Sequence, residues 1–141
     1  MSLEMTIEQI LHTLQSREGL IPTLGIQLEV DAGVVIGYLT IGTSHRGSPN
    51  AAHGGAVMTL LDTVLGMEAF NHALQQGQRT STVELKTNFL RPVRIGQRLV
   101  VRPELLSKGK SLLVMSGSAI DLDTKERVAF AVGTFNLFGH R

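Results

Sequence analysis

Residues 53–75 read HGGAVMTLLDTVLGMEAFNHALQ and contain the longest helical pattern of the chain. When the stretch is wound at 100° per residue, its bulky apolar residues spread over a wide arc. An opposite arc, about 80° wide, carries small residues and one acid. Its members are Gly55, Thr59, Asp62, Gly66, Ala69 and Ala73. Because no Lys or Arg stands between Ala56 and Leu74, we expect a helix over about residues 54–75 that is covered on both sides, on the small side by another chain.

The segments around this helix predict strands. Before it, the β-rich runs 24–30 and 34–41 flank Asp31-Ala32-Gly33, which is a hairpin signal. After it, strands are expected near residues 80–90, 97–106, 111–121 and 127–138. The turns between them are short, and parallel strands would need long crossovers, so the pairing is predicted to be antiparallel. Residues 1–141 therefore predict one α+β domain, an antiparallel sheet of five or six strands with one long helix.

Two further segments complete this outline. Thr6 and Gln9 have the spacing of a capping box, and apolar residues follow at helical spacing, so a short helix is expected over about residues 6–16. Residues 42–52 contain Gly, Ser, Pro and Asn, and they are expected to form a loop.

Composition is that of an ordinary globular domain, with 43% hydrophobic and 18% charged residues. The lack of cysteine excludes disulfides and thiolate metal sites. The start of the chain does not have the form of a secretory signal. The most apolar stretch, residues 56–74, carries two acids, an Asn and a His, so it does not read as a membrane span. We therefore expect a cytoplasmic protein that does not engage a membrane.

The net charge of +1 is unevenly distributed, because residues 79–110 hold eight basic residues against Glu84 and Glu104. The basic residues are Arg79, Lys86, Arg91, Arg94, Arg98, Arg102, Lys108 and Lys110. Either a solvated strand face or a partner bearing phosphates would explain this basic strip. Nucleic acid is not expected, since basic and aromatic residues are not interleaved for stacking. The five His residues are scattered without ligand spacing, so we expect neither a metal nor a cofactor.

The helix also carries candidate chemistry. Asp62 has no basic residue within one turn. It is a general base, a satisfied buried acid, or an acid that meets solvent at the edge of an interface. At the helix start, the N–H groups of Gly54 and Gly55 have no intrahelical partner, and the missing Cβ atoms leave them open to a ligand. With the positive end of the helix dipole they form a candidate oxyanion site. Glycines are also common where a loop meets a helix, and His53 is equally explained as a capping residue.

The spacing along the helix shows how the N–H of Gly54 and the carboxylate of Asp62 could act together. From Gly54 to Asp62 is eight residues, or about 12 Å at the α-helical rise. A reacting carbonyl lies about 3 Å from its donors, so one helix cannot present both groups to one carbonyl. If both are catalytic, two helices must pack antiparallel, with Gly54 of one subunit beside Asp62 of the other. The pair thus predicts a symmetric homodimer with two composite sites.

The run Asn50-Ala51-Ala52-His53-Gly54-Gly55-Ala56, with an acid nine residues after the His, resembles the signature of hotdog-fold thioesterases of the phenylacetate-degradation type. Residues 80–92, TSTVELKTNFLRP, resemble the strand and Arg-Pro turn that follow in this family. The similarity covers about residues 22–138. It implies a hotdog fold, a sheet wrapped around one long helix, paired as homodimers and often as homotetramers. It also implies a hydrolase, an acyl-CoA thioesterase for which coenzyme A is part of the substrate.

The resemblance also implies roles for five residues. Asp62 would be the nucleophile or the general base. The N–H of Gly54 or Gly55 would polarise the thioester carbonyl, with His53 helping to place it. Thr82 stands where the family often has a Ser or Thr that positions the acid or its water. Asp62 and Thr82 would come from one subunit and residues 53–55 from its partner.

One departure concerns the loop before the helix. Many relatives have an Asn six residues before the His, but this position is Gly47, and Asn50 is the candidate replacement. Arg91, Lys108 and Lys110 lie at expected strand ends and turns, where they would bind the phosphates of coenzyme A.

Two other functions remain open. The first is an acyl-CoA-binding module without turnover, which would have little use for an acid opposite an oxyanion-type helix start. The second is a hydratase or dehydratase of the same fold, in which the His follows the Asp, whereas His53 precedes Asp62. The acyl group also stays open; we expect residues 42–52 and the N-terminal helix to shape its pocket.

Overall fold

The computed structural model describes residues 4–139, which form a six-stranded antiparallel sheet around one long helix. The sheet has the order β1-β2-β6-β7-β8-β5. The helices are α1 (Ile7–Ser16), α2 (Leu20–Leu24) and α3 (Gly54–Leu74), with the short 3-10 turn η1 (Thr43–His45). The strands are β1 (Gln27–Asp31), β2 (Val34–Thr40), β3 (Arg46–Ser48), β4 (Ala51–Ala52), β5 (Arg79–Phe89), β6 (Arg98–Lys108), β7 (Leu112–Asp121) and β8 (Arg127–Phe138). This is the predicted hotdog fold.

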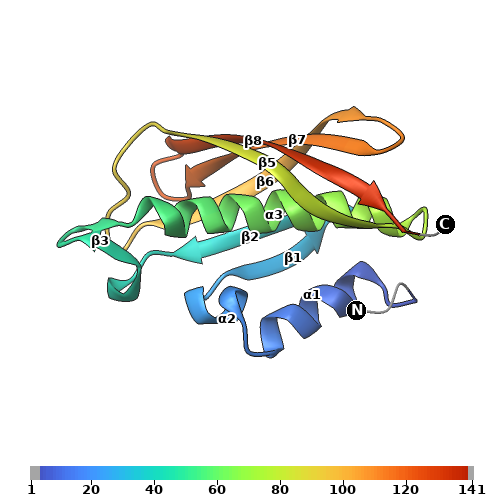
Figure 1. Ribbon diagram of the computed structural model, residues 1–141. Helices are drawn as coiled ribbons and strands as arrows, with labels where there is room; N and C mark the ends of the chain where they lie inside the picture. The colour runs from blue at the N-terminus through green and yellow to red at the C-terminus, as the bar shows by residue number, and fades with distance from the viewer. Residues whose placement is uncertain (1–3, 140–141) are drawn as a thin grey trace.

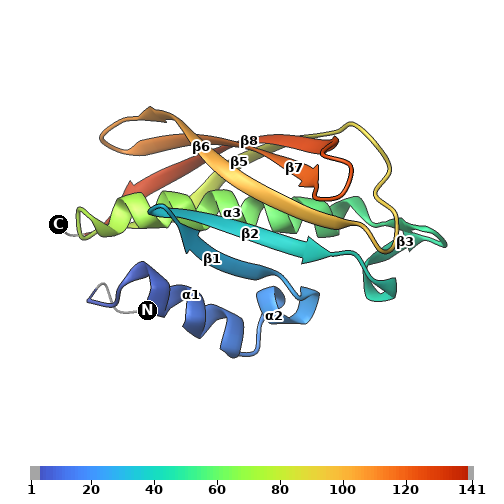
Figure 2. The same ribbon diagram turned by 180° about the vertical axis from the view of Figure 1, so that it is seen from behind.

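The long helix α3 lies in the hollow of the sheet, with β5–β8 on one side and β1 and β2 on the other (Figures 1 and 2). Its apolar arc is buried as predicted, and Leu60, Leu61 and Val64 are 0% exposed. No helix within residues 4–139 is long and apolar enough to cross a membrane.

The small arc of α3 is only partly as predicted. Ala69 and Ala73 are buried in the core of the chain itself, because the sheet covers this end of the helix. Asp62 and Gly66 keep part of their surface exposed. A second chain could therefore cover this arc only between Gly55 and Gly66.

The beginning of the chain contains one confirmed and one incorrect prediction. The Thr6 hydroxyl accepts a hydrogen bond from the N–H of Gln9, and the Gln9 side chain accepts one from the N–H of Thr6, so the capping box is present. The first strand, however, begins at Gln27, because residues 20–24 form α2. Gly25 ends this helix with φ +80°, a left-handed conformation that favours glycine.

The β1–β2 hairpin forms as expected, and both of its turn residues have positive φ, 51° at Ala32 and 79° at Gly33. The buried Glu68 of α3 accepts a hydrogen bond from the N–H of Val35, at 3.0 Å, and so joins the hairpin to the helix. Residues 42–52 were expected to be a loop. They instead contain η1 and a small hairpin of β3 and β4.

The strand β5 forms one edge of the sheet, and within residues 4–139 only β8 pairs with it. It is 11 residues long, and Val83 near its middle is 59% exposed. A long edge strand with an exposed apolar residue is suited to pairing with another chain.

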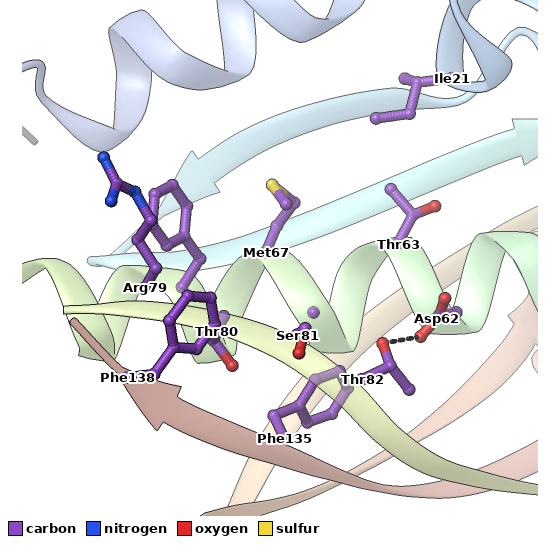
Figure 3. A pocket seen from close by; sticks show the side chains of 12 residues that line it. Ile21, Asp62, Thr63, Met67, Arg79, Thr80, Ser81, Thr82, Phe135 and Phe138 are labelled. Atoms are coloured by element: carbon purple, nitrogen blue, oxygen red, sulfur yellow. Dashed lines mark hydrogen bonds between the residues drawn. The ribbon is translucent and has the colours of Figure 1, made fainter. Parts of the chain in front are cut away.

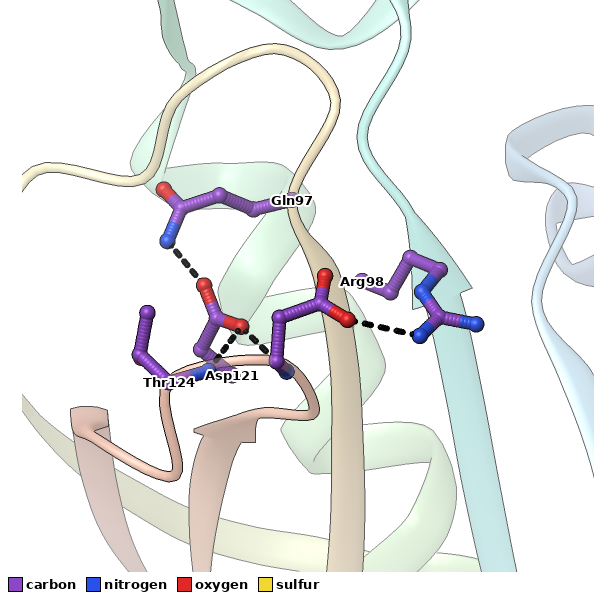
Figure 4. A network of polar contacts seen from close by, with 5 residues as sticks. Gln97, Arg98, Asp121 and Thr124 are labelled. Carbon is purple, nitrogen blue, oxygen red and sulfur yellow. Dashed lines mark hydrogen bonds and ion pairs between the residues drawn. The ribbon is translucent and has the colours of Figure 1, made fainter.

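A buried carboxylate holds the turn between β7 and β8 (Figure 4). Asp121 is 2% exposed and accepts hydrogen bonds from the side chain of Gln97 and from the N–H groups of Asp123, at 2.7 Å, and Thr124, at 3.2 Å. The hydrogen bond from Gln97 contributes most, followed by the N–H groups of Thr124 and Asp123, and together they hold the pKa of Asp121 below its ordinary value of 3.8.

The substitution Asp121→Asn is expected to make stability less dependent on pH in acid. Because folding lowers the pKa of Asp121, its carboxylate stabilises the fold above the ordinary carboxyl pKa, and this contribution is lost as the pH falls toward the folded-state value. Urea unfolding between about pH 6 and about pH 3 should show a steeper loss of stability in the wild type. Asp123→Asn is the control, since it leaves the bonds to Asp121 in place. Equal slopes for wild type and Asp121→Asn would contradict the expectation.

Candidate active site

The side chains of Asp62 and Thr82 lie side by side in the structure (Figure 3). Asp62 is on α3 and Thr82 on β5, and the Thr82 hydroxyl donates a hydrogen bond of 2.8 Å to Asp62 Oδ1. The register of β5 against β8 shifts between Thr82 and Glu84, an irregularity that can re-aim a side chain. No residue within 4–139 donates a hydrogen bond to Asp62 Oδ2. The Thr82 hydroxyl thus orients the carboxylate and leaves one oxygen available for a substrate or a water molecule.

This pair opens into a pocket of about 380 Å³ between α3 and the edge of the sheet. Most of its surface is apolar. Its lining residues are Ile21, Asp62, Thr63, Gly66, Met67, Phe70, Arg79, Thr80, Ser81, Thr82, Phe135 and Phe138. A largely apolar pocket with a few polar groups is typical of a site for an organic ligand. We call it the Asp62 pocket.

The start of α3 is capped by His53, whose ring Nδ1 accepts a hydrogen bond of 2.8 Å from the N–H of Gly55. An imidazole that accepts at Nδ1 carries its hydrogen on Nε2 when neutral. Within residues 4–139, no acceptor engages the N–H of Gly54. Of the two predicted oxyanion donors, the N–H of Gly54 is therefore free within the described residues, whereas the N–H of Gly55 is already hydrogen-bonded to His53.

Gly54 faces a second pocket, of about 370 Å³, whose lining includes Phe89, Leu90 and Arg91. A Cβ atom at Gly54 would lie 3.2 Å from the Phe89 ring, so glycine permits this close approach. Asp62 does not line this pocket, and Gly54 does not line the Asp62 pocket. The described chain thus presents the two groups on separate surfaces, as the spacing along the helix predicts.

The backbone around Gly47, in the loop before α3, leaves no room for an Asn side chain at this position. A Cβ atom on Gly47 would lie 2.8 Å from the Cα of His53, so no side chain fits there without a shift of the backbone. Asn50 is exposed beside the β3–β4 hairpin, where its carbonyl accepts a hydrogen bond of 3.4 Å from Ile95. It lines neither pocket, so the described chain does not bring Asn50 to the predicted site.

The three predicted phosphate-binding residues do not form one cluster in the described chain. Arg91 follows β5 and forms an exposed ion pair of 3.0 Å with Glu126. Lys108 and Lys110 are exposed at the β6–β7 turn, near the opposite end of the sheet. Counted along β8, the end of β5 lies opposite Ala129, and the end of β6 lies at the level of Phe135. These two positions are six residues apart, or about 20 Å along the strand.

The N-terminal part of the chain contributes to the Asp62 pocket through a residue that the sequence pattern did not reveal. The wall opposite β5 includes Ile21 of α2, whereas α1 and residues 42–52, which we expected to shape the pocket, contribute none of the described lining. The signal for α2 was the pair of glycines that bracket residues 20–24. No group of three or more His, Cys, Asp or Glu residues suited to a metal ion occurs among residues 4–139.

Comparison with known proteins supplies the family. The profile of the thioesterase superfamily matches residues 50–128, which include His53, Gly54, Asp62 and Thr82. This match covers more than half of the sequence, and the chain belongs to the thioesterase superfamily.

Relatives by sequence include acyl-coenzyme A thioesterase 13 of Homo sapiens, 26% identical over 93 residues, which cover 66% of this chain and 63% of the human protein. A putative esterase of Saccharolobus solfataricus is 36% identical over 86 residues, or 61% of this chain and 55% of that protein. The chain thus matches less than two thirds of the length of these relatives.

Solved structures with the same fold include the PaaI protein of the phenylacetic acid degradation operon of E. coli, with a TM-score of 0.83 and 22% identity, covering 99% of this chain and 98% of that one. The protein smu.793 of Streptococcus mutans, solved bound to acetyl CoA, has a TM-score of 0.71 and 22% identity, covering 82% of this chain and 90% of that one. At these identities the likeness establishes the shared fold.

Proposed function

We propose that this protein hydrolyses acyl-CoA thioesters to a free acid and coenzyme A. The observation that carries the proposal is the Thr82–Asp62 hydrogen bond, which orients a carboxylate on the wall of the Asp62 pocket and leaves its Oδ2 without a donor among residues 4–139. Membership of the thioesterase superfamily and the acyl-coenzyme A thioesterase named among the relatives support the same reaction.

Asp62 can act by either of two routes. As nucleophile, Oδ2 attacks the carbonyl carbon, expels coenzyme A as a thiolate and forms a mixed anhydride, which water then hydrolyses to the acid. As general base, the carboxylate takes a proton from a water molecule whose oxygen attacks the same carbon, and the C–S bond then breaks to release coenzyme A. Both routes place negative charge on the carbonyl oxygen, which needs a donor such as the free N–H of Gly54.

The donor and the acid would meet in a homodimer. Pairing of two β5 edges would place two copies of α3 side by side and antiparallel, with Gly54 of one subunit facing Asp62 of the other. Binding of the coenzyme A phosphates by Arg91, Lys108 and Lys110 is still a prediction from the sequence alone. A homotetramer and a cytoplasmic location remain predictions from the sequence.

The proposal is tested by following free thiol release from short, medium, long and aromatic acyl-CoAs. Turnover by the wild type supports hydrolysis and identifies the acyl class. Binding of coenzyme A esters without release of thiol would support the binding module instead. Addition of water to an unsaturated acyl-CoA, with the thioester intact, would support the hydratase.

The composite site predicts complementation between two inactive variants. Asp62→Asn and Gly54→Pro each damage both sites of a homodimer, whereas a heterodimer of the two has one intact site and one doubly damaged site. Random pairing should therefore restore about a quarter of the wild-type specific activity. The measurement is thiol release after co-expression or joint refolding, and each variant paired with itself is the control. No recovery in confirmed heterodimers would show that each site lies within one chain.

A further inference from the structure

The Asp62 pocket has a cation at the end remote from the candidate catalytic carboxylate. Figure 3 shows Asp62 and Thr82 at one end of the pocket and Arg79 with Phe138 at the other. The wall between them includes Met67 and other apolar side chains. The pocket therefore combines a reactive carboxylate, an apolar middle and a positively charged far end.

Arg79 differs from several other arginines of the basic strip. Arg91, Arg98 and Arg102 each form an ion pair with a carboxylate of this chain, to Glu126, Asp123 and Asp31. The Arg79 guanidinium forms no ion pair or hydrogen bond with any residue in 4–139. A guanidinium presents several N–H donors in a planar fork that matches a carboxylate. The unpaired fork of Arg79 is thus available to an anion in the pocket.

The distance from Arg79 to Thr82 indicates which part of the substrate would carry that anion. Arg79 and Thr82 are three residues apart on β5, or about 10 Å. The phosphates of coenzyme A are separated from the thioester by the whole pantetheine arm, and this arm leaves the reacting carbon on the side of the sulfur. The acyl chain leaves the same carbon on the other side, and the apolar wall near Met67, Phe135 and Phe138 suits its hydrocarbon.

We propose that the acyl group accepted by the Asp62 pocket is an ω-carboxyacyl group, the half thioester of a dicarboxylic acid, with its free carboxylate bound by Arg79. The inference rests on the proposed function, because it takes the thioester carbon to lie at Asp62. Arg79 is a specificity residue here: it contacts the far end of the substrate and takes no part in the bond that breaks. An aliphatic spacer of medium length would span the apolar middle of the pocket.

The test compares octanedioyl-CoA with octanoyl-CoA, which differ only in the terminal carboxylate. The wild type should have a higher kcat/KM for octanedioyl-CoA, and Arg79→Gln should lower the ratio of the two kcat/KM values by about tenfold to a hundredfold. Arg17→Gln is the matched control, since Arg17 is an exposed arginine outside the pocket. An equal loss for both substrates would assign Arg79 to the phosphates of coenzyme A and overturn the proposal, as would a wild type that prefers octanoyl-CoA.

A binding experiment separates failure of this inference from failure of the proposed function. If no acyl-CoA of the panel above is hydrolysed, the proposed function fails, and calorimetry of the two intact thioesters then tests Arg79 by itself. Tighter binding of octanedioyl-CoA that is lost in Arg79→Gln supports the anion site. Equal affinities for the two ligands overturn it.

Discussion

Replacement of Asp62 by Asn is expected to lower kcat for thioester hydrolysis by about a thousandfold or more while the protein remains folded. The amide keeps the shape of the side chain, and its oxygen can still accept the hydrogen bond from Thr82. It cannot ionise, so it provides neither a nucleophilic oxygen nor a base for water. The measurement is thiol release, with circular dichroism and thermal unfolding as checks of the fold.

Glu104→Gln is the matched control for this substitution. Glu104 is an exposed carboxylate on β6, outside both the Asp62 pocket and the pocket at Gly54. Its loss removes the same charge without touching the candidate site. Turnover that survives in Asp62→Asn would remove Asp62 from the mechanism, and with it the basis for the composite site.

Gly54→Pro is expected to lower kcat by about a hundredfold to a thousandfold, the usual effect of removing one oxyanion donor. Gly54 is the first residue of α3, where proline is well tolerated. His53 before it has φ −62° and ψ 135°, a conformation that a following proline favours. The substitution therefore removes an N–H that no residue in 4–139 engages, with little disturbance of the helix.

Gly54→Ala separates loss of the donor from added volume. Alanine keeps the N–H and adds a Cβ atom 3.2 Å from the Phe89 ring, which is 51% exposed and can move. Steady-state kinetics should show Gly54→Ala much closer to the wild type than Gly54→Pro. Equal losses in both variants would mean that volume at this position is decisive and that the N–H of Gly54 is not the oxyanion donor.

Much of the fold could be predicted because local patterns determine it. The helical arc of residues 54–75, the turn at Asp31-Ala32-Gly33 and the capping box at Thr6 are confirmed, since each depends on residues close in the chain. The prediction that the first strand begins at residue 24 was wrong, because no local pattern revealed the helix α2. A five-residue helix between two glycines has too few turns to show a helical period.

The candidate site, too, could be predicted only in part from the sequence. Spacing along one helix was enough to show that Gly54 and Asp62 cannot serve one carbonyl from the same chain, and the separate pockets agree with it. The resemblance indicated Thr82 as the partner of the acid, and the structure shows their hydrogen bond. Local spacing did not reveal that His53 occupies the N–H of Gly55, because this depends on the orientation of one imidazole ring.

By itself, the sequence determined the type and order of most elements, the antiparallel pairing and the separation of the two candidate catalytic groups, because all of these follow from the helical period, turn residues and short connections. Only the tertiary structure decided what surrounds Asp62. Its pocket is lined by residues as distant in the chain as Ile21, Arg79 and Phe138. It also decided that Arg91 lies far from Lys108 and that Ala69 is buried in its own core. These facts depend on how far the sheet curves around the helix, and that curvature results from packing between distant segments, which no local period records.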